Sequence, residues 1–394
     1  MARNIMHTPE GTRDLVYGEC RLKREVQNRL TALFAHCGYS EIATPAVEYW
    51  NVFSKAGSAV PEEGTLKMID RNGSVLVLRP DCTLPIARVL ATRLHREKLP
   101  CRFYYNETIF RSAAAHAGHM SEIDQCGVEL IGAAGCRADA EVVAMALEGL
   151  QSCELPGFRM ELGHAAFFKA LADELDADEE RVETIRSLIE QKSFAALNDL
   201  LREEFSDRAS YRALRRLSRL FGGVEVLDEA RSLTNNPVAL KALDELSEVY
   251  EELCAAGWGD YVGFDLGLVH QIDYYTGLVF CGYVEGPGHA VVTGGRYDHL
   301  METFGRSAPA TGFAVDVSGV ASAMQEKPFS VPRKLIHYEA GCLAAAMELQ
   351  RSASVGEIEL SCCETLEESR RIAREKGIAI LIRLDADGIT EEVL

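Results

Sequence analysis

The sequence predicts an α+β protein in which an antiparallel sheet flanked by helices carries a helical insertion and precedes a small α/β domain. Residues 102–111 and 123–131 have the pattern of two strands joined by an elongated loop, which is typical of an antiparallel pair. Residues 165–261 instead show long, charged helical patterns with leucine at every third or fourth position. A chain of 394 residues is too long for one small core. We therefore expect a core domain over residues 1–325 and a C-terminal domain over residues 334–394.

The core is expected to begin with a helix over residues 19–36, where apolar residues recur at helical spacing until Cys37-Gly38 ends the pattern. Strands are expected over residues 40–47 and 74–78, the second running into an Arg-Pro-Asp segment. An amphipathic helix over residues 84–95 then leads to the strand pair.

A helix and a strand are expected between the strand pair and the insertion, at residues 138–150 and 158–162. After the insertion, strands return at residues 262–268, 278–283 and 289–293, followed by a glycine-rich turn and a strand-to-helix unit that ends near residue 320. Two prolines mark residues 325–333 as the linker. The terminal domain is expected to alternate strand and helix over residues 334–338, 342–350, 357–360, 366–376 and 379–384.

The charge balance argues against a chain that mainly grips nucleic acid. Lys and Arg number 41 against 60 Asp and Glu, which gives a formal net charge of −19, and such a field repels a polyanion. No apolar run is long enough to span a bilayer or to serve as a signal peptide, so we expect a cytoplasmic protein. The 12 cysteines show no CxxC or finger spacing, so zinc has no support and free thiols are expected.

Two segments of the core bring polar residues to strand ends or to one sheet face. In residues 79–83, Asp81 and Thr83 follow a strand, where a carboxylate and a hydroxyl can meet an amine; a strand-ending proline beside a solvated aspartate is the alternative. Gln125 and Glu129 share one sheet face, and Gly127 between them leaves room for a ligand. A sheet face turned to water is the alternative there.

Three further segments are weak signals when taken singly. Arg111 ends a strand before a long loop. The segment His270 to Tyr275 contains a lone histidine and the Tyr274-Tyr275 pair, and both features are more often structural than part of a site. Residues 294–298 (GGRYD) are consistent with an anion site or with a plain turn. His116 and His119 have metal-ligand spacing but no nearby carboxylate or cysteine, which favours ordinary loop residues.

Together, these segments resemble the catalytic core of histidyl-tRNA synthetase, a class II aminoacyl-tRNA synthetase, over about residues 8–320. Pro9–Asp14 matches the PxGxxD opening of that family, and Arg79–Thr83 resembles its RPEGT segment. Phe110-Arg111 resembles the start of motif 2 (FRxERPQ), and residues 125–129 resemble the QLGCE strand. His270–Tyr275 resembles the histidine-specific RGLDYY motif, and residues 294–298 match GGRYD. The resemblance implies the class II synthetase fold for the core.

The resemblance also shows where this chain departs from an adenylating enzyme, which needs cations around the reacting phosphate. Ser121 stands where that family has a second loop arginine, His270 replaces the arginine of RGLDYY, and Gly319 stands at the closing motif 3 arginine. Of four expected arginines only Arg111 remains. Removing one such charge often costs ~10²–10³ in rate, so we expect no adenylation and no catalytic residue.

The amino-acid pocket of that family is better preserved, and the resemblance implies a histidine site. Its residues here are Asp81, Thr83, Arg111, Gln125, Glu129, His270, Tyr274 and Tyr275. Carboxylates and an amide can accept from the ammonium group of a bound histidine, and the tyrosines can wall and bind its imidazole. Asp81 is one methylene shorter than the family's glutamate, and His270 weakens carboxylate recognition.

A synthetase core with a histidine pocket, without an ATP site and with a shortened acidic tail resembles the family of ATP phosphoribosyltransferase regulatory subunits. The resemblance implies a non-catalytic chain, without cofactor or metal, that works with a short catalytic subunit at the first step of histidine biosynthesis. It further implies L-histidine as a feedback effector, pairing of regulatory chains through the synthetase-like dimer within a hetero-octamer, and no tRNA or membrane partner. Two alternatives remain open: a ligase that activates histidine with ATP, and a free-standing synthetase-like amino-acid sensor.

Overall fold

The computed structural model describes residues 7–54, 62–112, 120–269, 274–324 and 332–394. The chain divides into two compact units, residues 1–325 and residues 326–394. Each unit has its own sheet and its own hydrophobic core.

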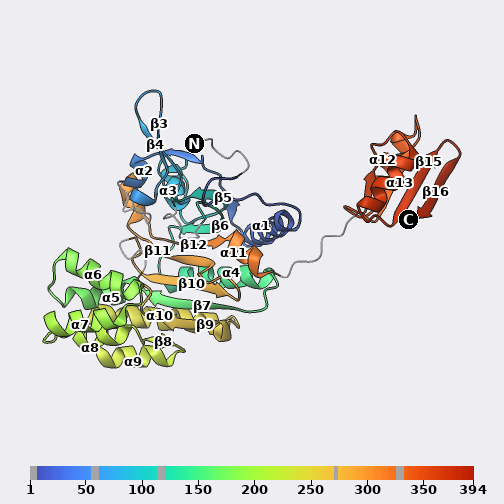
Figure 1. Cartoon of the computed structure of the whole chain (residues 1–394). Coiled ribbons are helices and arrows are strands. Elements are labelled where there is room, and N and C mark those ends of the chain that lie inside the picture. Colours follow the sequence, from blue (N-terminus) through green and yellow to red (C-terminus); the bar gives the residue numbers. More distant parts are fainter. Residues whose placement is uncertain (1–6, 55–61, 113–119, 270–273, 325–331) are drawn as a thin grey trace. The chain divides into compact units, whose positions relative to one another are not determined.

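A nine-stranded mixed sheet forms the centre of the first unit (Figure 1). Its strand order is β1-β5-β6-β12-β11-β10-β7-β9-β8, and neighbours run antiparallel except for the parallel pairs β1·β5 and β7·β9. The strands are β1 (Ser40–Glu41), β5 (Cys101–Phe110), β6 (Glu122–Ile131), β7 (Phe158–His164), β8 (Phe221–Gly222), β9 (Val262–Asp265), β10 (Leu278–Val284), β11 (Val292–Arg296) and β12 (Ala310–Asp316). The predicted antiparallel pairing of residues 102–111 with 123–131 is confirmed by β5 and β6.

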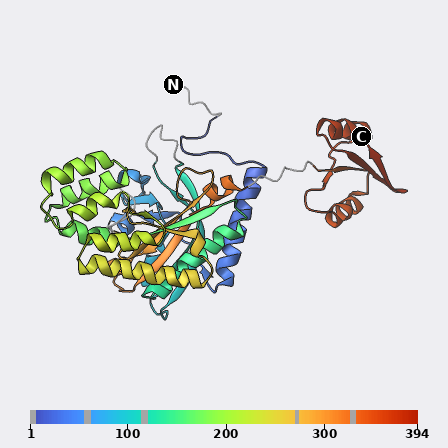
Figure 2. The ribbon, with the colours of Figure 1, turned by 90° about the horizontal axis from the view of Figure 1, so that it is seen from below.

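Helices cover one face of this sheet. They are α1 (Gly18–His36), α4 (Cys136–Ser152), α10 (Pro237–Ala255) and α11 (Val317–Ala323), and Figure 2 shows α1 and α4 lying along the outside of the sheet. Phe313 of β12 points to this side, where its ring meets that of Phe34 edge to face at 5.7 Å between centroids. Because side chains alternate along a strand, the neighbouring residue Gly312 faces the other way, onto the open face of the sheet.

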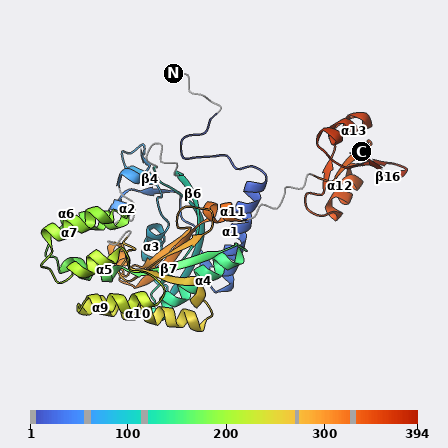
Figure 3. The same ribbon diagram turned by 60° about the horizontal axis from the view of Figure 1, so that its bottom comes forward.

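Residues 165–261 fold mainly as helices, as the leucine spacing predicts. The helices are α5 (Ala165–Asp173), α6 (Glu179–Glu190), α7 (Phe194–Glu204), α8 (Tyr211–Leu217), α9 (Glu225–Leu233) and α10, with the turn η2 (Gly259–Tyr261). They gather at the β7-β9-β8 end of the sheet (Figure 1), and Figure 3 shows α9 beside α10. The insertion joins the rest of the unit through the short strand β8 and through packing of α10 against α4 and β7.

A small three-stranded sheet, in the order β2-β4-β3, lies in the N-terminal part of the unit. Its strands are β2 (Val47–Tyr49), β3 (Lys67–Ile69) and β4 (Val75–Leu78), accompanied by α2 (Asn51–Ser54), the turn η1 (Glu62–Gly64) and α3 (Thr83–Ala91). The prediction of one strand over residues 40–47 is wrong, because β1 and β2 belong to two different sheets. Pro45 lies between them, and a proline lacks the N–H that continues a ladder.

The second unit is a four-stranded sheet with one helix on each face. The strand order is β14-β13-β15-β16, with β13 (Lys334–Tyr338), β14 (Ile358–Leu360), β15 (Ile380–Asp385) and β16 (Gly388–Val393). Leu335 and Leu381 pack with Ala373 of α13 (Leu366–Glu375), whereas Ile336 and Ile382 pack with Ala346 of α12 (Leu343–Ser352). The alternation of strand and helix matches the prediction, except that the hairpin strand β16 was not predicted.

Candidate amino-acid pocket on the open face of the sheet

Neighbouring strands place Glu129 at the centre of the open face. In the sheet register Glu129 of β6 lies between Phe103 of β5 and Gly312 of β12, and Gly312 lies opposite Gly295 of β11. Gln125 and Gly127 share this face with Glu129, as period two predicts. On this face of the sheet, the carboxylate of Glu129 therefore lies beside two glycines of the next two strands, Gly312 and Gly295.

The carboxyl group of Glu129 is buried and held by two hydroxyl groups. Its side chain is 2% exposed. Thr83 Oγ1 donates to Glu129 Oε1 at 2.6 Å, and the Tyr297 hydroxyl donates to Glu129 Oε2. Burial raises the pKa of Glu129 well above its ordinary value, and the nearby Asp81 carboxyl raises it further, while the Thr83 bond opposes the shift. This group can therefore hold a proton until a cation arrives to replace it.

A second carboxyl group, that of Asp81, lies where the segment after β4 enters α3. Asp81 Oδ1 accepts a hydrogen bond from the backbone N–H of Leu84 at 3.2 Å. Burial raises the pKa of Asp81, with the Leu84 N–H and the Arg111 guanidinium opposing the shift. Thr83, at the first position of α3, thus stands between the two carboxyl groups of the site.

Arg111 follows β5 and places a cation close enough to Asp81 to act on its carboxyl group. Its Nε donates to the backbone carbonyl of Pro80 at 3.0 Å. Burial raises the pKa of both Asp81 and Tyr275, and the charge of Arg111 opposes that rise. The preceding arginine of the same region, Arg79, has a different role. It is buried and donates to the carbonyls of Thr44 and Thr108 at 2.6 and 2.8 Å and to the Glu107 carboxylate.

Three tyrosines form an aromatic wall beside Glu129. The Tyr274 ring meets that of Tyr275 edge to face at 5.1 Å between centroids, and it lies 5.2 Å from the Tyr297 ring. Burial raises the pKa of Tyr274 well above its ordinary value, and the Asp81 and Glu129 carboxyl groups add to the shift. Burial raises the pKa of Tyr275 as well, so the hydroxyls of Tyr274 and Tyr275 stay protonated and can donate hydrogen bonds at neutral pH.

Glycines under these groups let the side chains lie flat on the sheet. A Cβ atom at Gly312 would overlap Glu129 Oε2 and the carbonyl of Val128, and one at Gly295 would lie 2.8 Å from the Tyr275 ring. A Cβ atom at Gly127 would lie 2.5 Å from the hydroxyl of Tyr105. No side chain fits at these positions without displacing a residue of the pocket.

Six of the eight residues predicted for the site converge, namely Asp81, Thr83, Arg111, Glu129, Tyr274 and Tyr275. Gln125 lies half-buried on the same face, two positions beyond Gly127. His270 lies outside the described residues. Sequence reasoning missed Tyr105 and Tyr297 as pocket residues; the only available signal for Tyr297 was its place in GGRYD.

The GGRYD segment is not a turn, because Gly294 and Gly295 lie within β11. Arg296 is buried and binds Asp139 of α4 through two bonds of 2.9 and 3.0 Å, and Asp298 at 3.0 Å. It also donates to the carbonyls of Ala133 and Gly135 at 3.3 Å. These partners occupy the guanidinium, so the interpretation of GGRYD as an anion site is not supported.

Gly319 and Ser121 stand at two positions where an adenylating relative carries arginine. Gly319 has no room for a side chain, and the backbone of Ser121 forms two hydrogen bonds. At Gly319 a Cβ atom would lie 2.8 Å from Val291 Cγ1 and 2.9 Å from Asp316 Oδ2. Ser121 closes the base of its loop, where its N–H donates to the Gly11 carbonyl at 2.7 Å and its carbonyl accepts from Arg111 N at 2.9 Å. His116 and His119 lie outside the described residues.

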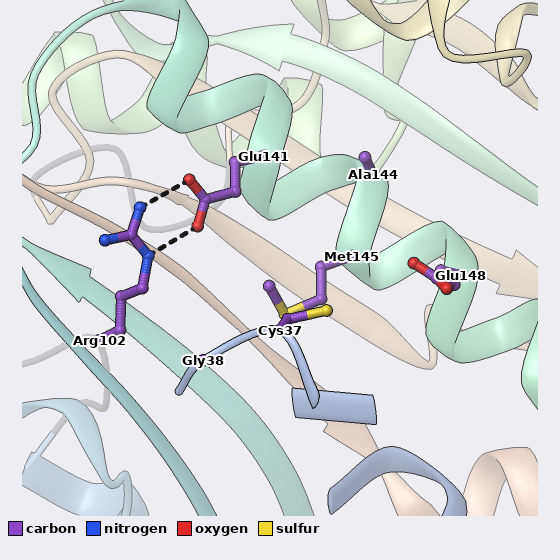
Figure 4. Close-up of a pocket in the computed structure, with 7 residues that line it drawn as sticks. All are labelled: Cys37, Gly38, Arg102, Glu141, Ala144, Met145 and Glu148. Atoms are coloured by element: carbon purple, nitrogen blue, oxygen red, sulfur yellow. Dashed lines mark hydrogen bonds and ion pairs between the residues drawn. The ribbon is translucent and has the colours of Figure 1, made fainter. Parts of the chain in front are cut away.

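A separate hollow of about 690 Å³ opens on the helix side of the sheet (Figure 4). Arg102 lies in this hollow on β5 with its guanidinium bound to both oxygens of Glu141, at 2.9 and 3.0 Å. Tyr39 donates to the same carboxylate at 2.9 Å, and Cys37 and Glu148 complete the rim. Arg102 pairs with Leu130, the residue after Glu129, so this hollow and the Glu129 pocket lie on opposite faces.

Residues 11–320 match the family model of histidyl-tRNA synthetase. A Clostridium kluyveri protein named ATP phosphoribosyltransferase regulatory subunit is 38% identical over 97% of this chain and 100% of its own length. A Bacillus halodurans structure described as an ATP phosphoribosyltransferase regulatory subunit/histidyl-tRNA synthetase has a TM-score of 0.88 at 29% identity, covering 98% of this chain and 100% of that one. Histidyl-tRNA synthetase from Nostoc shares the fold, with a TM-score of 0.78 at 19% identity over 98% and 96% of the chains.

The family model matches the synthetase-like core alone, whereas the likenesses to the Clostridium kluyveri protein and to the two structures extend over nearly the whole chain. Among the described residues, no helix combines the length and apolar character that crossing a membrane requires. The chain therefore belongs to the ATP phosphoribosyltransferase regulatory subunits, the non-catalytic, histidyl-tRNA synthetase-like family of histidine biosynthesis.

Proposed function

We propose that this regulatory subunit binds free L-histidine in the Glu129 pocket and transmits that binding to a short catalytic subunit, which it also activates. The observation that carries the proposal is the buried Glu129 carboxyl group between Thr83 and Tyr297, with Asp81 close enough to raise its pKa. Two neighbouring carboxyl groups with raised pKa values form a receptor for a cation.

The functional groups of histidine match the chemistry of the pocket. Its ammonium group takes the place of a proton on the carboxyl groups of Asp81 and Glu129, whose pKa values are raised. Its carboxylate needs a cation, and the guanidinium group of Arg111 is available for it. Its imidazole is flat and needs both a hydrogen-bond partner and an apolar wall, which Tyr274 and Tyr275 provide. Gln125 adds an amide at the open end of the same face.

Feedback follows from linkage between histidine binding and the arrangement of the complex. Histidine inhibits only if it binds the less active arrangement more tightly, and a tenfold preference corresponds to about 1.4 kcal/mol. One charge-assisted hydrogen bond made in only one arrangement is enough to supply this difference. The bonds of Glu129 to Thr83 on α3 and to Tyr297 after β11 tie separate elements to the occupancy of one carboxylate.

ATP activation of histidine does not fit the residues around the pocket. Of the four arginines that the synthetase family places around the reacting phosphate, only Arg111 remains in this chain. Gly319 lacks space for a side chain, and Arg296 is occupied by Asp139 and Asp298. The developing charge of a reacting phosphate therefore has too few cations near it. We assign the chain to binding and regulation in the cytoplasm, where its free cysteines stay reduced.

Self-association through the small sheet forms part of the same proposal. Val47, Tyr49 and Met68 share one face of the β2-β4-β3 sheet and are 41%, 57% and 39% exposed. Leu76 and Leu78 of β4 lie on the same face. A contiguous apolar face of this kind is typical of a protein interface, so we assign the pairing of regulatory chains to it.

The direct test is phosphoribosyl-ATP formation by the organism's short catalytic subunit, measured alone, with this chain, and with this chain plus histidine. We expect activation by the chain and its reversal by histidine. ATP–pyrophosphate exchange driven by histidine would instead support the ligase alternative. Histidine binding without any effect on the catalytic subunit would support a free-standing sensor.

A further inference from the structure

An arginine-rich segment interrupts the otherwise acidic helical insertion. Residues 208–219 read RASYRALRRLSR, with five arginines and no aspartate or glutamate, in a chain whose net charge is −19. All five arginine side chains are exposed. The Glu129 pocket involves none of these residues.

The spacing of these arginines arranges four of them as one stripe. α8 spans Tyr211–Leu217 and buries Ala213, Leu214 and Leu217. Arg208, Arg212, Arg215 and Arg219 follow one another at intervals of four, three and four residues, which places residues of a helix on one side. The turns at either end of α8 keep the chain coiled through Arg208 and Arg219, with backbone bonds from Tyr211 N to Arg208 O and from Arg219 N to Arg216 O.

Little negative charge compensates the stripe. Arg215 donates to the Asn198 amide oxygen and the Tyr211 hydroxyl, both at 3.0 Å, and its guanidinium lies over the Tyr211 ring at 5.2 Å. Arg208 comes only within 3.8 Å of the well exposed Asp176. Within the described part of the chain, Arg212 and Arg219 have no acidic partner. Arg216 lies off the stripe and pairs with Glu229 at 2.5 Å.

We propose that the Arg208–Arg219 stripe docks an acidic surface of the short catalytic subunit. This inference rests on the proposed function and names one contact through which the two subunits meet. Arginine is enriched at protein interfaces, and a stripe pre-ordered by Tyr211 and Asn198 loses less entropy on binding. The apolar face of the β2-β4-β3 sheet stays free for the second regulatory chain.

A protein partner fits the stripe better than RNA does. A nucleic acid must approach a chain of net charge −19 along many phosphates, and long-range repulsion opposes that approach. A protein can present a short acidic face to the stripe alone and place neutral or basic groups against the surrounding acidic helices. We therefore expect the stripe to contribute to the choice of partner and to increase the association rate constant.

The test compares two double variants of equal net charge. Arg212→Glu/Arg219→Glu reverses the middle and end of the stripe, whereas Arg137→Glu/Arg351→Glu reverses two exposed arginines elsewhere. The dissociation constant for the catalytic subunit is measured for each by titration calorimetry at two salt concentrations. We expect the stripe variant to weaken binding by roughly tenfold or more at low salt, and less at high salt, with the control near wild type.

The outcomes separate this inference from the proposed function. If the stripe variant binds the catalytic subunit as tightly as the control does, the stripe is not the docking surface. If the wild-type chain fails to bind the catalytic subunit at all, the proposed function fails first. A wild-type chain that binds a structured RNA, and loses that binding only in the stripe variant, overturns the choice of a protein partner. Unchanged histidine binding and thermal unfolding of the stripe variant show that its fold and pocket are intact.

Discussion

The hydroxyl group of Tyr297 donates a hydrogen bond to the buried carboxyl group of Glu129, joining the end of β11 to β6 on the open face of the sheet. Thr83 occupies the other oxygen of the same carboxyl group at 2.6 Å. The carboxyl group of Glu129 therefore accepts one hydrogen bond from Thr83 of α3 and one from Tyr297 of the GGRYD segment. Any ligand that changes its ionisation changes both contacts.

Replacing Glu129 by glutamine removes the negative charge and keeps the shape. An amide cannot replace a carboxylate as partner of an ammonium group, and a hydrogen bond to a charged group is worth about 1.5–3 kcal/mol. We expect Glu129→Gln to raise the histidine concentration for half-inhibition by roughly tenfold or more, with little change in the uninhibited rate of the complex. Inhibition assays at saturating catalytic subunit measure this. Wild-type sensitivity in the variant would place the effector outside this pocket.

The raised pKa of Glu129 also predicts how stability depends on pH. A carboxyl group whose folded-state pKa lies above its unfolded value stabilises the fold while it is protonated, and it loses that contribution as pH rises from about 4.3 through the folded pKa. Glutamine does not titrate. We therefore expect Glu129→Gln to gain free energy of unfolding relative to wild type between pH 5 and pH 8.

Urea unfolding at both pH values measures this difference, and it needs only the isolated chain. Thr83 and Tyr297 can still bond the amide, because a hydroxyl both donates and accepts. An equal stability difference at pH 5 and pH 8 would show that Glu129 titrates normally in the folded chain.

Gly312 leaves the space in which the Glu129 carboxyl group lies. A Cβ atom there would overlap Glu129 Oε2 and the Val128 carbonyl, so Gly312→Ala forces the carboxyl group away from Tyr297. Overpacking of this kind costs about 1–3 kcal/mol. We expect a lower unfolding midpoint together with weaker histidine inhibition. Gly288→Ala is the matched control, because a Cβ atom there meets nothing within 4 Å. Equal behaviour of the two variants would contradict this account.

The sequence predicts the β5–β6 pair because two strand-like segments are separated by an elongated loop, and this pair carries Glu129. It does not predict β3 or β16. Each is one strand of a hairpin, with β4 and β15 as partners, and is extended because it pairs with that partner and not because of its own residue pattern. The open face was predictable from the spacing of Gln125, Gly127 and Glu129. The contact of Tyr297 with Glu129 spans 168 positions, and no local pattern encodes a contact of that range.

The buried pair of Arg296 and Asp139 is expected to support the fold and not to bind an anion. Two bonds of 2.9 and 3.0 Å join β11 to α4 through this pair. Breaking one partner of a buried pair costs about 3–5 kcal/mol. We expect Asp139→Ala to lower the free energy of unfolding by that amount in urea. We also expect pyrophosphate to leave the unfolding midpoint of the wild-type chain unchanged; a clear rise that Asp139→Ala enhances would revive the anion site.

The exposed face of the β2-β4-β3 sheet is expected to set the oligomeric state. Tyr49 is its most exposed member, at 57%, between Val47 and the half-buried Leu76. A glutamate at this position in a paired face would be buried against apolar residues without a partner, at a cost of several kcal/mol. We expect Tyr49→Glu to convert a dimer into a folded monomer, as measured by light scattering after gel filtration. Phe221→Glu is the control, because Phe221 is similarly exposed at 64% but lies in β8 at the far edge of the large sheet. A Tyr49→Glu chain that keeps the wild-type mass, or a Phe221→Glu chain that loses it, would move the interface away from the small sheet.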